Sequence, residues 1–359
     1  MIPVPFFVHH GSLEPFLMKL TVDSGSNKPL YKQITEQVEK AVRSGSLASG
    51  TLLPSMNVLA AEMNISKETV KKAYAILRDK GILTPRQGKG FYVTDPMDSD
   101  KPLSILLLFD KISVYKQVLF NAFAREIGDA ADITILTHNQ SLDLLNYYLD
   151  ENLDNFDYYV ITPHFPLDAA SQAQALRLVS RVPNRKLVML DRLIPGMSGN
   201  FGAVYQDFEN DVYYGLAEGL DRLRSSSELK VLTLPDSLYG GYIGKGVDRF
   251  CKEFDIPVRY YDSIPEAISR HDTFLVLNSQ LGDALVELSR NIKNAGLRVG
   301  TDVRIISYNE FPLNEVVLGG LTTISTDFRE MGRLAARMIL DRKPSKIHCP
   351  FRMTRRSTF

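Results

Sequence analysis

The spacing of apolar residues changes near residues 94–102, and this change constrains the fold of the 359-residue chain more than any other feature. Before this stretch, apolar residues recur every three or four positions, as amphipathic helices require; one example is Leu30, Ile34 and Val38. After it, short apolar runs alternate with helix-length amphipathic segments. Residues 94–102, TDPMDSDKP, contain two prolines and no apolar periodicity. We therefore expect a linker there, between two domains of different class.

The first domain, residues 28–93, is predicted to contain three helices and a β-hairpin. Ser55 and Ser66 are suitable N-caps for the second and third helices, because their hydroxyls can accept from the first free amides. The four-residue link from Met63 to Ser66 has the length of a helix-turn-helix connection. The glycine-rich turn PRQGKG then separates two short apolar runs and predicts a hairpin.

The charge of this domain differs from that of the whole chain. The chain has 42 Lys and Arg against 42 Asp and Glu, whereas residues 28–93 contain eleven and five, a local net charge of +6. Such local excess is typical of nucleic-acid contact. Helical spacing leaves Lys67, Lys71 and Lys72 exposed near the start of the third helix, where a recognition helix reaches the major groove. The alternative is a basic helix face that only contacts solvent.

Residues 28–93 resemble the winged-helix DNA-binding domain of the GntR family of bacterial transcription regulators. The matching elements include Pro29-Leu30-Tyr31, Leu53-Pro54-Ser55, Ser66-Lys67 with Thr69-Val70, and Gly88-Lys89-Gly90-Phe91. The resemblance implies that double-stranded operator DNA is bound by Ser55, Asn57, Ser66, Lys67, Thr69, Lys71, Arg86, Gln87, Gly88 and Lys89. Where the family often has Glu-Arg after Pro-Ser, this chain has Met56-Asn57, so we expect an altered operator preference or weaker binding.

Residues 103–359 are predicted to form a two-lobed α/β domain with mostly parallel sheets. Strand-length and helix-length segments alternate, which indicates βαβ units. The expected strands are residues 103–109, 133–136, 158–162, 186–191, 203–206, 230–234, 258–261, 273–278 and 304–308. The expected helices are residues 115–127, 142–153, 169–181, 210–224, 244–254 and 281–295.

This second domain contains no recognisable catalytic or metal-binding motif. His138, His164, His271 and His348 have no metal-ligand spacing. The segment 240–246 lacks the first glycine and the final Ser/Thr of a phosphate loop, and is expected to be a loop entering a helix. We therefore expect no enzyme activity, no metal and no cofactor. A carbohydrate enzyme with an accessory DNA-binding head is the alternative.

The same domain resembles the periplasmic-binding-protein-like sensor of LacI/GalR-type repressors. The most specific matches are GLRVGTDVRIISYN (residues 296–309) and LTTI (residues 321–324), which is followed by Asp327 and Met331-Gly332. The resemblance implies two lobes joined by crossing segments, expected near Asp207, Asn309 and Ser325, and a small effector, usually a sugar, in the cleft. Polar groups at strand ends suit a polyol. The residues expected to bind it are Ser113, Tyr115, Arg192, Asp207, Asn278 and Asn309.

Each of these residues has a structural alternative. Asp191 and Arg192 could form a surface ion pair, and Asp207 could cap the next helix. Tyr115 could pack in the core, and the two asparagines could terminate strands. Ile243 stands where many LacI-type sensors have Arg, and Asn309 stands where they often have an acid, so a common hexose is not assumed. A vestigial cleft is a further alternative.

Together the two resemblances imply a homodimeric, sugar-responsive regulator, similar in arrangement to the arabinose repressors and expected to repress carbohydrate-utilisation genes. Cys251 and Cys349 lie far apart, which favours free thiols and a cytoplasmic location. No apolar run approaches the ~20 residues of a membrane span, and the first residues do not resemble a secretion signal. Residues 1–27 are expected to be a disordered arm, or an extension upstream of a start at Met18.

Overall fold

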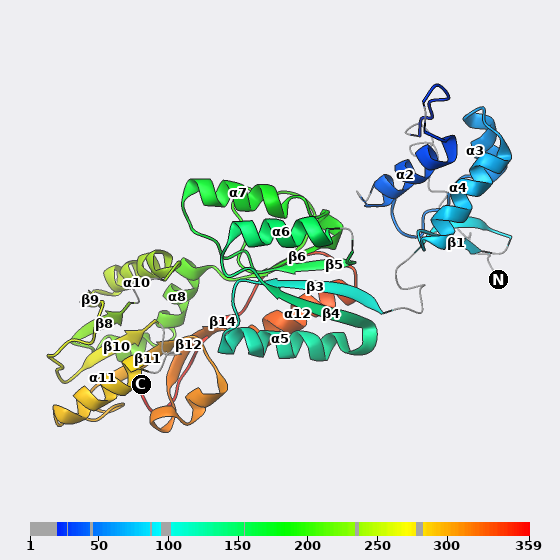
Figure 1. Ribbon diagram of the computed structural model, residues 1–359. Coiled ribbons are helices and arrows are strands. Elements are labelled where there is room, and N and C mark those ends of the chain that lie inside the picture. The colour runs from blue at the N-terminus through cyan, green and yellow to red at the C-terminus, as the bar shows by residue number, and fades with distance from the viewer. Residues whose placement is uncertain are drawn as a thin grey trace, which may run out of the picture. The chain divides into compact units, whose positions relative to one another are not determined.

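A computed structural model describes residues 20–26, 28–43, 46–86, 88–94, 102–153, 155–233, 237–277 and 283–359. The chain divides into two compact units, Met1–Leu103 and Ser104–Phe359. Each unit has its own buried apolar core. The first unit, called the head below, is drawn in blue and cyan in Figure 1. The second is called the effector unit.

The head consists of three described helices and a hairpin. These are α2 (Leu30–Arg43), α3 (Met56–Glu62), α4 (Lys67–Asp79), β1 (Leu83–Arg86) and β2 (Gly90–Val93). β1 and β2 are antiparallel, with Leu83 opposite Val93 and Arg86 opposite Gly90. The strands therefore extend into the segment expected to be a turn. The three helices, the four-residue link and the hairpin were predicted from the sequence.

Local capping and one buried tyrosine explain why the head folds this way. The Ser55 hydroxyl accepts from the amide of Val58, and the Ser66 hydroxyl accepts from the amide of Thr69, each at 3.2 Å. Both bonds satisfy an amide that the first turn of a helix leaves free. Tyr74 is fully buried and donates its hydroxyl to the carbonyl of Pro54 at 2.8 Å, which ties α4 to the start of α3.

The first lobe of the effector unit is a six-stranded sheet with helices on both faces. Its strand order is β13-β7-β6-β5-β3-β4. The strands are β3 (Leu103–Phe109), β4 (Ala131–Thr137), β5 (Tyr158–Ile161), β6 (Leu187–Asp191), β7 (Gly202–Tyr205) and β13 (Lys346–His348). α6 (Leu142–Asn152) and α7 (Ala169–Val179) cover one face, and α5 (Val114–Ile127) and α12 (Phe328–Leu340) cover the other (Figure 1).

The second lobe repeats this plan. Its strand order is β14-β12-β11-β10-β8-β9, and β14 is antiparallel to β12 whereas the other pairs are parallel. The strands are β8 (Glu228–Leu232), β9 (Val258–Tyr261), β10 (Asp272–Val276), β11 (Arg304–Tyr308), β12 (Thr322–Thr326) and β14 (Phe351–Thr354). The helices are α8 (Phe208–Ala217), α9 (Leu220–Leu223), α10 (Gly240–Phe254) and α11 (Asp283–Asn294). The predicted class, two mostly parallel α/β sheets, is confirmed.

The structure corrects several expectations from the sequence. β12, β13, β14 and α12 were not predicted. The expected loop at residues 240–246 is already helical, because α10 begins at Gly240, and the expected helix 210–224 is two helices. The chain crosses between lobes at residues 205–208, 326–328 and 348–351. Asn309 is not at a crossing, because the chain after β11 returns to the same sheet as β12.

Two glycines allow helices to pack closely within the lobes. A Cβ on Gly332 of α12 would lie 2.3 Å from the carbonyl oxygen of Leu119 in α5. A Cβ on Gly246 of α10 would lie 2.1 Å from the carbonyl oxygen of Glu209 in α8. Both distances are shorter than any real contact of that kind, so these helix pairs require glycine. Over the described residues, no helix has the length and apolar character to span a membrane.

Candidate functional site

The first candidate site is the surface formed by the start of α4. Lys67 and Lys71 are exposed there, and Lys71 makes a loose contact of 3.4 Å with Glu68. Lys72 lies 4.0 Å from the ring of Tyr31, a cation–π contact that holds this ammonium over α2. The exposed ion pair between Lys71 and Glu68 contributes little to stability. Lys67 and Lys71 can therefore leave solvent, or the loose contact with Glu68, and bind phosphates or base edges at a small cost in free energy.

Hydroxyl and amide groups accompany these cations. Ser66 is exposed, and its hydroxyl lies 2.8 Å from that of Thr69, so both are held at the first turn of α4. Ser55 and Asn57 are exposed at the start of α3. The capping bond uses one lone pair of the Ser55 oxygen and leaves its proton available for an acceptor such as a phosphate.

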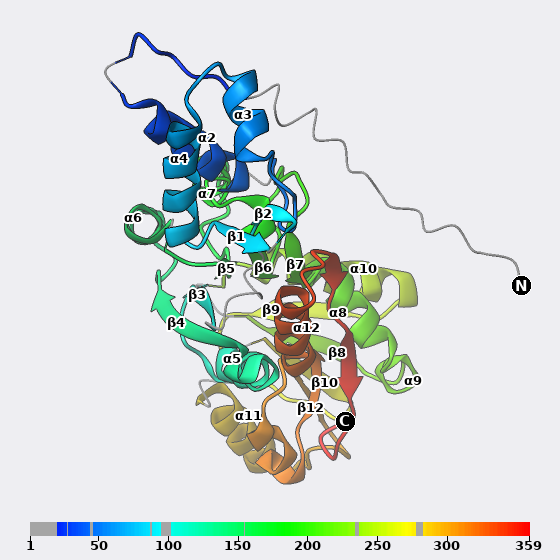
Figure 2. The ribbon, with the colours of Figure 1, turned by 90° about the vertical axis from the view of Figure 1, so that its right-hand side faces the viewer.

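The hairpin supplies the remaining predicted DNA contacts. The Arg86 guanidinium lies 4.7 Å from the ring centre of Tyr92, which orients it along β2. Gly88 and Gly90 have φ values of 72° and 106°, a backbone region that favours glycine. Lys89 is exposed, and its amide donates to the carbonyl of Arg86 at 2.9 Å. Gln87 lies outside the described residues. Figure 2 shows the hairpin β1–β2 together with α3 and α4.

The second candidate site lies in the effector unit, where the carboxyl ends of the parallel strands meet. In α/β sheets this edge is where ligands bind. In the first lobe, Asp110 follows β3, His164 follows β5, and Asp191 and Arg192 end and follow β6. The second lobe provides residues that follow β8 and end β11, including Tyr239 and Tyr308. We call this region the cleft.

A buried charge cluster occupies the first lobe's side of the cleft. Lys116 of α5 is 1% exposed, and its ammonium lies 2.5 Å from Asp191 and 3.2 Å from Asp110. The Nε2 atom of His164 lies 2.9 Å from the same Asp191 oxygen. Gln206 donates to the other Asp191 oxygen and accepts from Thr326 at 2.7 Å. Because Gln206 and Thr326 lie at two of the three crossings, the cluster is connected directly to the segments that join the lobes.

The cluster shifts the pKa values of its members in opposite directions. Burial alone would raise the pKa of Asp191, but the charges of Lys116 and His164 outweigh burial and hold this pKa well below its usual range. Burial would likewise lower the pKa of Lys116, but Asp191 and Asp110 outweigh it and raise this pKa. The carboxylates and the ammonium are therefore all charged near neutral pH.

Several buried polar atoms around this cluster have no hydrogen-bond partner among the described residues. They include Nη1 of Arg192, Nδ1 of His138 and the hydroxyls of Tyr239 and Tyr308; Oδ1 of Asn309, the residue after Tyr308, is also without a partner. The centre of the Tyr239 ring is 5.6 Å from the Arg192 guanidinium and 5.0 Å from the centre of the His164 ring. Asp191 affects the pKa of both tyrosines. Buried polar atoms without partners are rare in folded proteins, so this group indicates a place for a ligand or water.

The six predicted effector residues have different surroundings. Arg192 is 8% exposed and faces the cleft, and Asp191 is 1% exposed, so the alternative of a surface ion pair is wrong. Asp207 caps α8 and accepts from both the backbone and the side-chain amide of Asn210, as the capping alternative proposed. Asn309 has a φ of 77° and an unpartnered oxygen. Asn278 lies outside the described residues.

The remaining two residues are at the start of α5. Ser113 is the N-cap of that helix and accepts from the amide of Lys116 at 3.4 Å. Tyr115 is half-buried and stacks on Phe328, with ring centres 4.7 Å apart. Ile243, which stands in place of the family's arginine, is 4% exposed and belongs to the apolar core of the second lobe. It therefore provides no polar group to the cleft.

Lys116, Asp110, His164, Tyr239 and Tyr308 were not among the residues predicted to bind the effector. One signal was present for Lys116, because it shares a helix face with Leu119, Phe123 and Ile127, which are all buried. A lysine on an apolar helix face is buried only where it has a counter-charge. For the acidic and histidine residues the signal was their place directly after a strand.

A cavity of about 340 Å³ lies beside the cleft, near the lower end of the range for small-molecule sites, ~300–1,000 Å³. It is lined by Val118, Glu310, Phe311, Pro312, Glu315, Ser325, Thr326, Asp327, Phe328, Arg329, Arg352, Thr354 and Arg356. None of the five predicted effector residues that the structure describes is in its wall. It adjoins them through Phe328, which stacks on Tyr115, and through Glu310, which follows Asn309.

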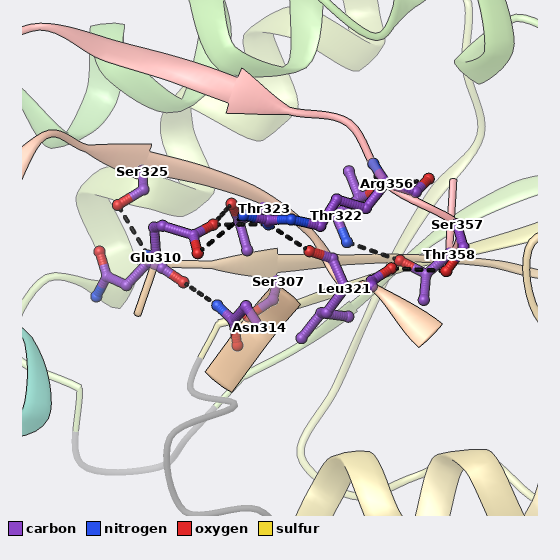
Figure 3. A network of polar contacts seen from close by, with 12 residues as sticks. Ser307, Glu310, Asn314, Leu321, Thr322, Thr323, Ser325, Arg356, Ser357 and Thr358 are labelled. Carbon is purple, nitrogen blue, oxygen red and sulfur yellow. Dashed lines mark hydrogen bonds and ion pairs between the residues drawn. The ribbon is translucent and has the colours of Figure 1, made fainter. Parts of the chain in front are cut away.

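A polar network fixes one wall of this cavity. Arg356 donates to both carboxylate oxygens of Glu310, at 2.9 and 3.2 Å, and Thr323 also donates to Glu310. The Ser325 hydroxyl accepts from the amide of Glu310 at 2.9 Å. Figure 3 shows these side chains around Glu310, with Thr358 next to Thr322, whose amide donates to the Thr358 hydroxyl at 2.8 Å. Since Glu310 is already paired, it is part of the wall and not a free counter-charge.

Comparisons with known proteins agree with this architecture. Residues 30–93 match the family model described as bacterial regulatory proteins, gntR family, and residues 259–358 match a periplasmic binding protein-like domain. The HTH-type transcriptional regulator Rv1152 of Mycobacterium tuberculosis is 37% identical over 82 residues, 22% of this chain and 68% of the relative. Two further curated regulators also match, and the matched region of this chain covers 31% and 58% of their lengths.

Solved structures match the effector unit. The trehalose repressor from Escherichia coli is 16% identical with a TM-score of 0.57, covering 71% of this chain and all of that one. The Lac repressor dimer bound to operator and an anti-inducer is 17% identical with a TM-score of 0.55, covering 73% and 96%. At these identities the likeness establishes the fold alone.

The helix-turn-helix head and the two-lobed binding-protein fold together define a transcriptional regulator with a DNA-binding domain and a ligand-binding type of domain. On the similarity of its head, the chain belongs to the GntR family of bacterial regulatory proteins. The effector unit has the LacI-type fold that the sequence predicted.

Proposed function

We propose that this protein is a repressor whose operator binding is controlled by a monosaccharide in the cleft. The observation that supports the effector site most strongly is the set of unpartnered buried atoms on Arg192, Tyr239, Tyr308 and Asn309. They come from both lobes, so a ligand that binds all of them favours one arrangement of the lobes. We infer that the regulated genes serve carbohydrate utilisation, because these polar groups suit a sugar.

The coupling to DNA follows from the crossings. Arg192 follows Asp191 in the chain, and Asp191 is connected through Gln206 to Thr326, so the cluster reaches two of the crossings. A ligand that changes the lobes' arrangement changes these contacts and, in a dimer, the spacing of the two heads. A coupling free energy of ~1–3 kcal/mol corresponds to a change in operator affinity of roughly 5- to 150-fold.

A homodimer is part of this proposal. Two heads would bind a palindromic operator, as helix-turn-helix dimers do. Large apolar side chains are exposed in both lobes of the effector unit, among them Ile112 (64%), Leu313 (63%) and Val316 (70%). The Lac repressor similar to this chain was solved as a dimer on its operator. Sedimentation of wild type and Val316→Asp, expected to weaken the dimer, tests the assembly.

The effector is tested by thermal shift with the purified full chain. Monosaccharides, pentoses, deoxyhexoses and phosphosugars are screened, and a stereospecific, saturable shift identifies a ligand, since binding to the native state raises Tm. Fluorescence anisotropy on operator DNA selected from a random library then measures whether that ligand lowers affinity. If no sugar shifts Tm while DNA binding is intact, the sugar effector is rejected and the cleft is vestigial or binds another class.

A further inference from the structure

We propose that the effector is a sugar acid, bound through its carboxylate to Arg192, and not a neutral monosaccharide. This inference rests on the proposed function and concerns the ligand class of the same cleft. It starts from the charges. Asp110 and Asp191 share the ammonium of Lys116, and His164 also contacts Asp191. Both buried carboxylates of the cleft therefore contact Lys116, and neither forms an ion pair with Arg192.

Arg192 differs from these residues. It is 8% exposed, makes no ion pair with any described residue, and has a fully buried Nη1 without an acceptor. Its neighbour Asp191 is bonded to Lys116, His164 and Gln206 instead. A guanidinium cannot lose its proton in a protein, so it cannot avoid burial costs by neutralising. A buried cation without a partner is stabilised by an anion, and planar carboxylates match its geometry.

The other unpartnered groups favour an acceptor-rich ligand. Tyr239 and Tyr308 have free hydroxyls, and burial raises the pKa of both, so they keep their protons and can donate. With Arg192 this makes three unmet donors, whereas Oδ1 of Asn309 and Nδ1 of His138, whose Nε2 donates to the carbonyl of Thr162, are unmet acceptors. A carboxylate only accepts, and a sugar hydroxyl can donate to Asn309. A neutral polyol offers the Arg192 guanidinium only uncharged acceptors, whereas a carboxylate gives it the charge-assisted hydrogen bonds that no described residue provides.

The aromatic contacts fix the position of the Arg192 guanidinium and of the Tyr239 hydroxyl. The ring of Tyr239 stacks on Phe208 with centres 4.2 Å apart and planes 5° apart, which holds it beneath the Arg192 guanidinium. Phe208 and Arg192 therefore cover the two faces of this ring, and Tyr239 offers a ligand its unpartnered hydroxyl at the ring's edge. One unpaired cation matches a charge of −1, whereas a phosphate monoester carries about −1.5 to −2 at pH 7. A carboxylate therefore fits better than a phosphate.

The test compares matched ligands on the full chain. Thermal-shift titrations use glucuronate with glucose and glucuronamide, and galacturonate with galactose, with glucose 6-phosphate as the phosphate probe. We expect at least one uronate to bind about 10-fold or more tightly than its neutral partners, as a charged hydrogen bond implies. We expect Arg192→Gln to remove this preference with little change in the ligand-free Tm, because the guanidinium forms no ion pair with a described residue and its contact with the Tyr239 ring is long, at 5.6 Å.

Arg329→Gln is the matched control. Arg329 is exposed and lines the 340 Å³ cavity beside the cleft, so its loss should leave uronate affinity unchanged. Stronger binding of neutral sugars or of the phosphate overturns the sugar-acid inference but leaves the proposed function standing. Loss of uronate binding in Arg329→Gln but not in Arg192→Gln overturns the assigned position. If no sugar of any kind binds, the proposed function fails as well.

Discussion

Replacing Lys116 by methionine tests whether the buried charge cluster stabilises the effector unit. The ammonium of Lys116 is 2.5 Å from Asp191 and 3.2 Å from Asp110, and all three side chains are at most 2% exposed. Methionine keeps the unbranched shape and removes the charge, so two buried carboxylates lose the cation they share. Removing one partner of a buried ion pair costs about 3–5 kcal/mol. For a unit of this size that corresponds to about 6–20 °C in Tm.

The loss should depend on pH. In the wild type, Lys116 holds the pKa values of Asp110 and Asp191 below the usual range, so their contribution is present above the unfolded pKa and lost as pH falls through the lowered values. Without Lys116, burial is offset only in part, by His164 and the remaining hydrogen bonds, so both pKa values rise. The difference in free energy of unfolding between the wild type and the variant therefore becomes smaller as pH falls. The difference should be largest near pH 8 and smaller near pH 4.5.

Urea unfolding at both pH values, followed by circular dichroism, measures this difference. Lys111→Met is the control, because Lys111 is exposed just before α5 and its replacement should cost little. The double variant Lys116→Met/Asp191→Asn removes opposite charges together and should recover part of the loss. A cost below about 1 kcal/mol at pH 8, or an equal cost at pH 4.5, would refute the electrostatic reasoning.

Three further predictions concern other parts of the molecule. Lys71→Ala should weaken operator binding and reduce the slope of log affinity against log salt by about 1, as measured by anisotropy from 50 to 200 mM salt; an unchanged slope excludes a phosphate contact. Gly332→Ala should destabilise the effector unit by about 1–3 kcal/mol in urea, because its Cβ meets the backbone of Leu119 at 2.3 Å; unchanged stability would contradict the α5–α12 packing. Burial raises the pKa of Asp211 to about 6, even though His348 lies 2.7 Å away. A raised carboxyl pKa means stability present below about pH 4 and lost as pH rises through 6, so Asp211→Asn should remove this loss in a pH series of Tm values.

The head could be predicted almost residue by residue because its determinants are local. Ser55 and Ser66 each cap a helix within three residues, and both bonds are present. The positive φ of Gly88 belongs to the turn in which it stands. Contact between these residues and DNA stays a prediction.

The end of the effector unit was harder to predict because its strands have no apolar pattern of their own. In β12, Thr322-Thr323-Ile324-Ser325-Thr326, four of five residues are polar, yet all five are buried. The hydroxyls are accommodated by distant partners: Thr322 accepts from the amide of Arg356, Thr323 donates to Glu310, and Thr326 donates to Gln206. α12 does show helical spacing in Phe328, Met331, Ala335 and Ile339, so its sequence contained the signal.

The cleft differs from both cases, because its chemistry depends on pairs that no spacing along the chain can show. Lys116 and Asp191 are 75 positions apart, and only their contact decides that Arg192, beside Asp191, is left without a counter-charge. The sequence led to Arg192 through a resemblance, and that reasoning gave a polyol. In the structure, however, Asp110 and Asp191 pair with Lys116. The class of ligand that such a cleft binds is therefore set by which charged side chains have no partner within the protein. Comparing the binding of uronates and neutral sugars to Arg192→Gln tests this directly.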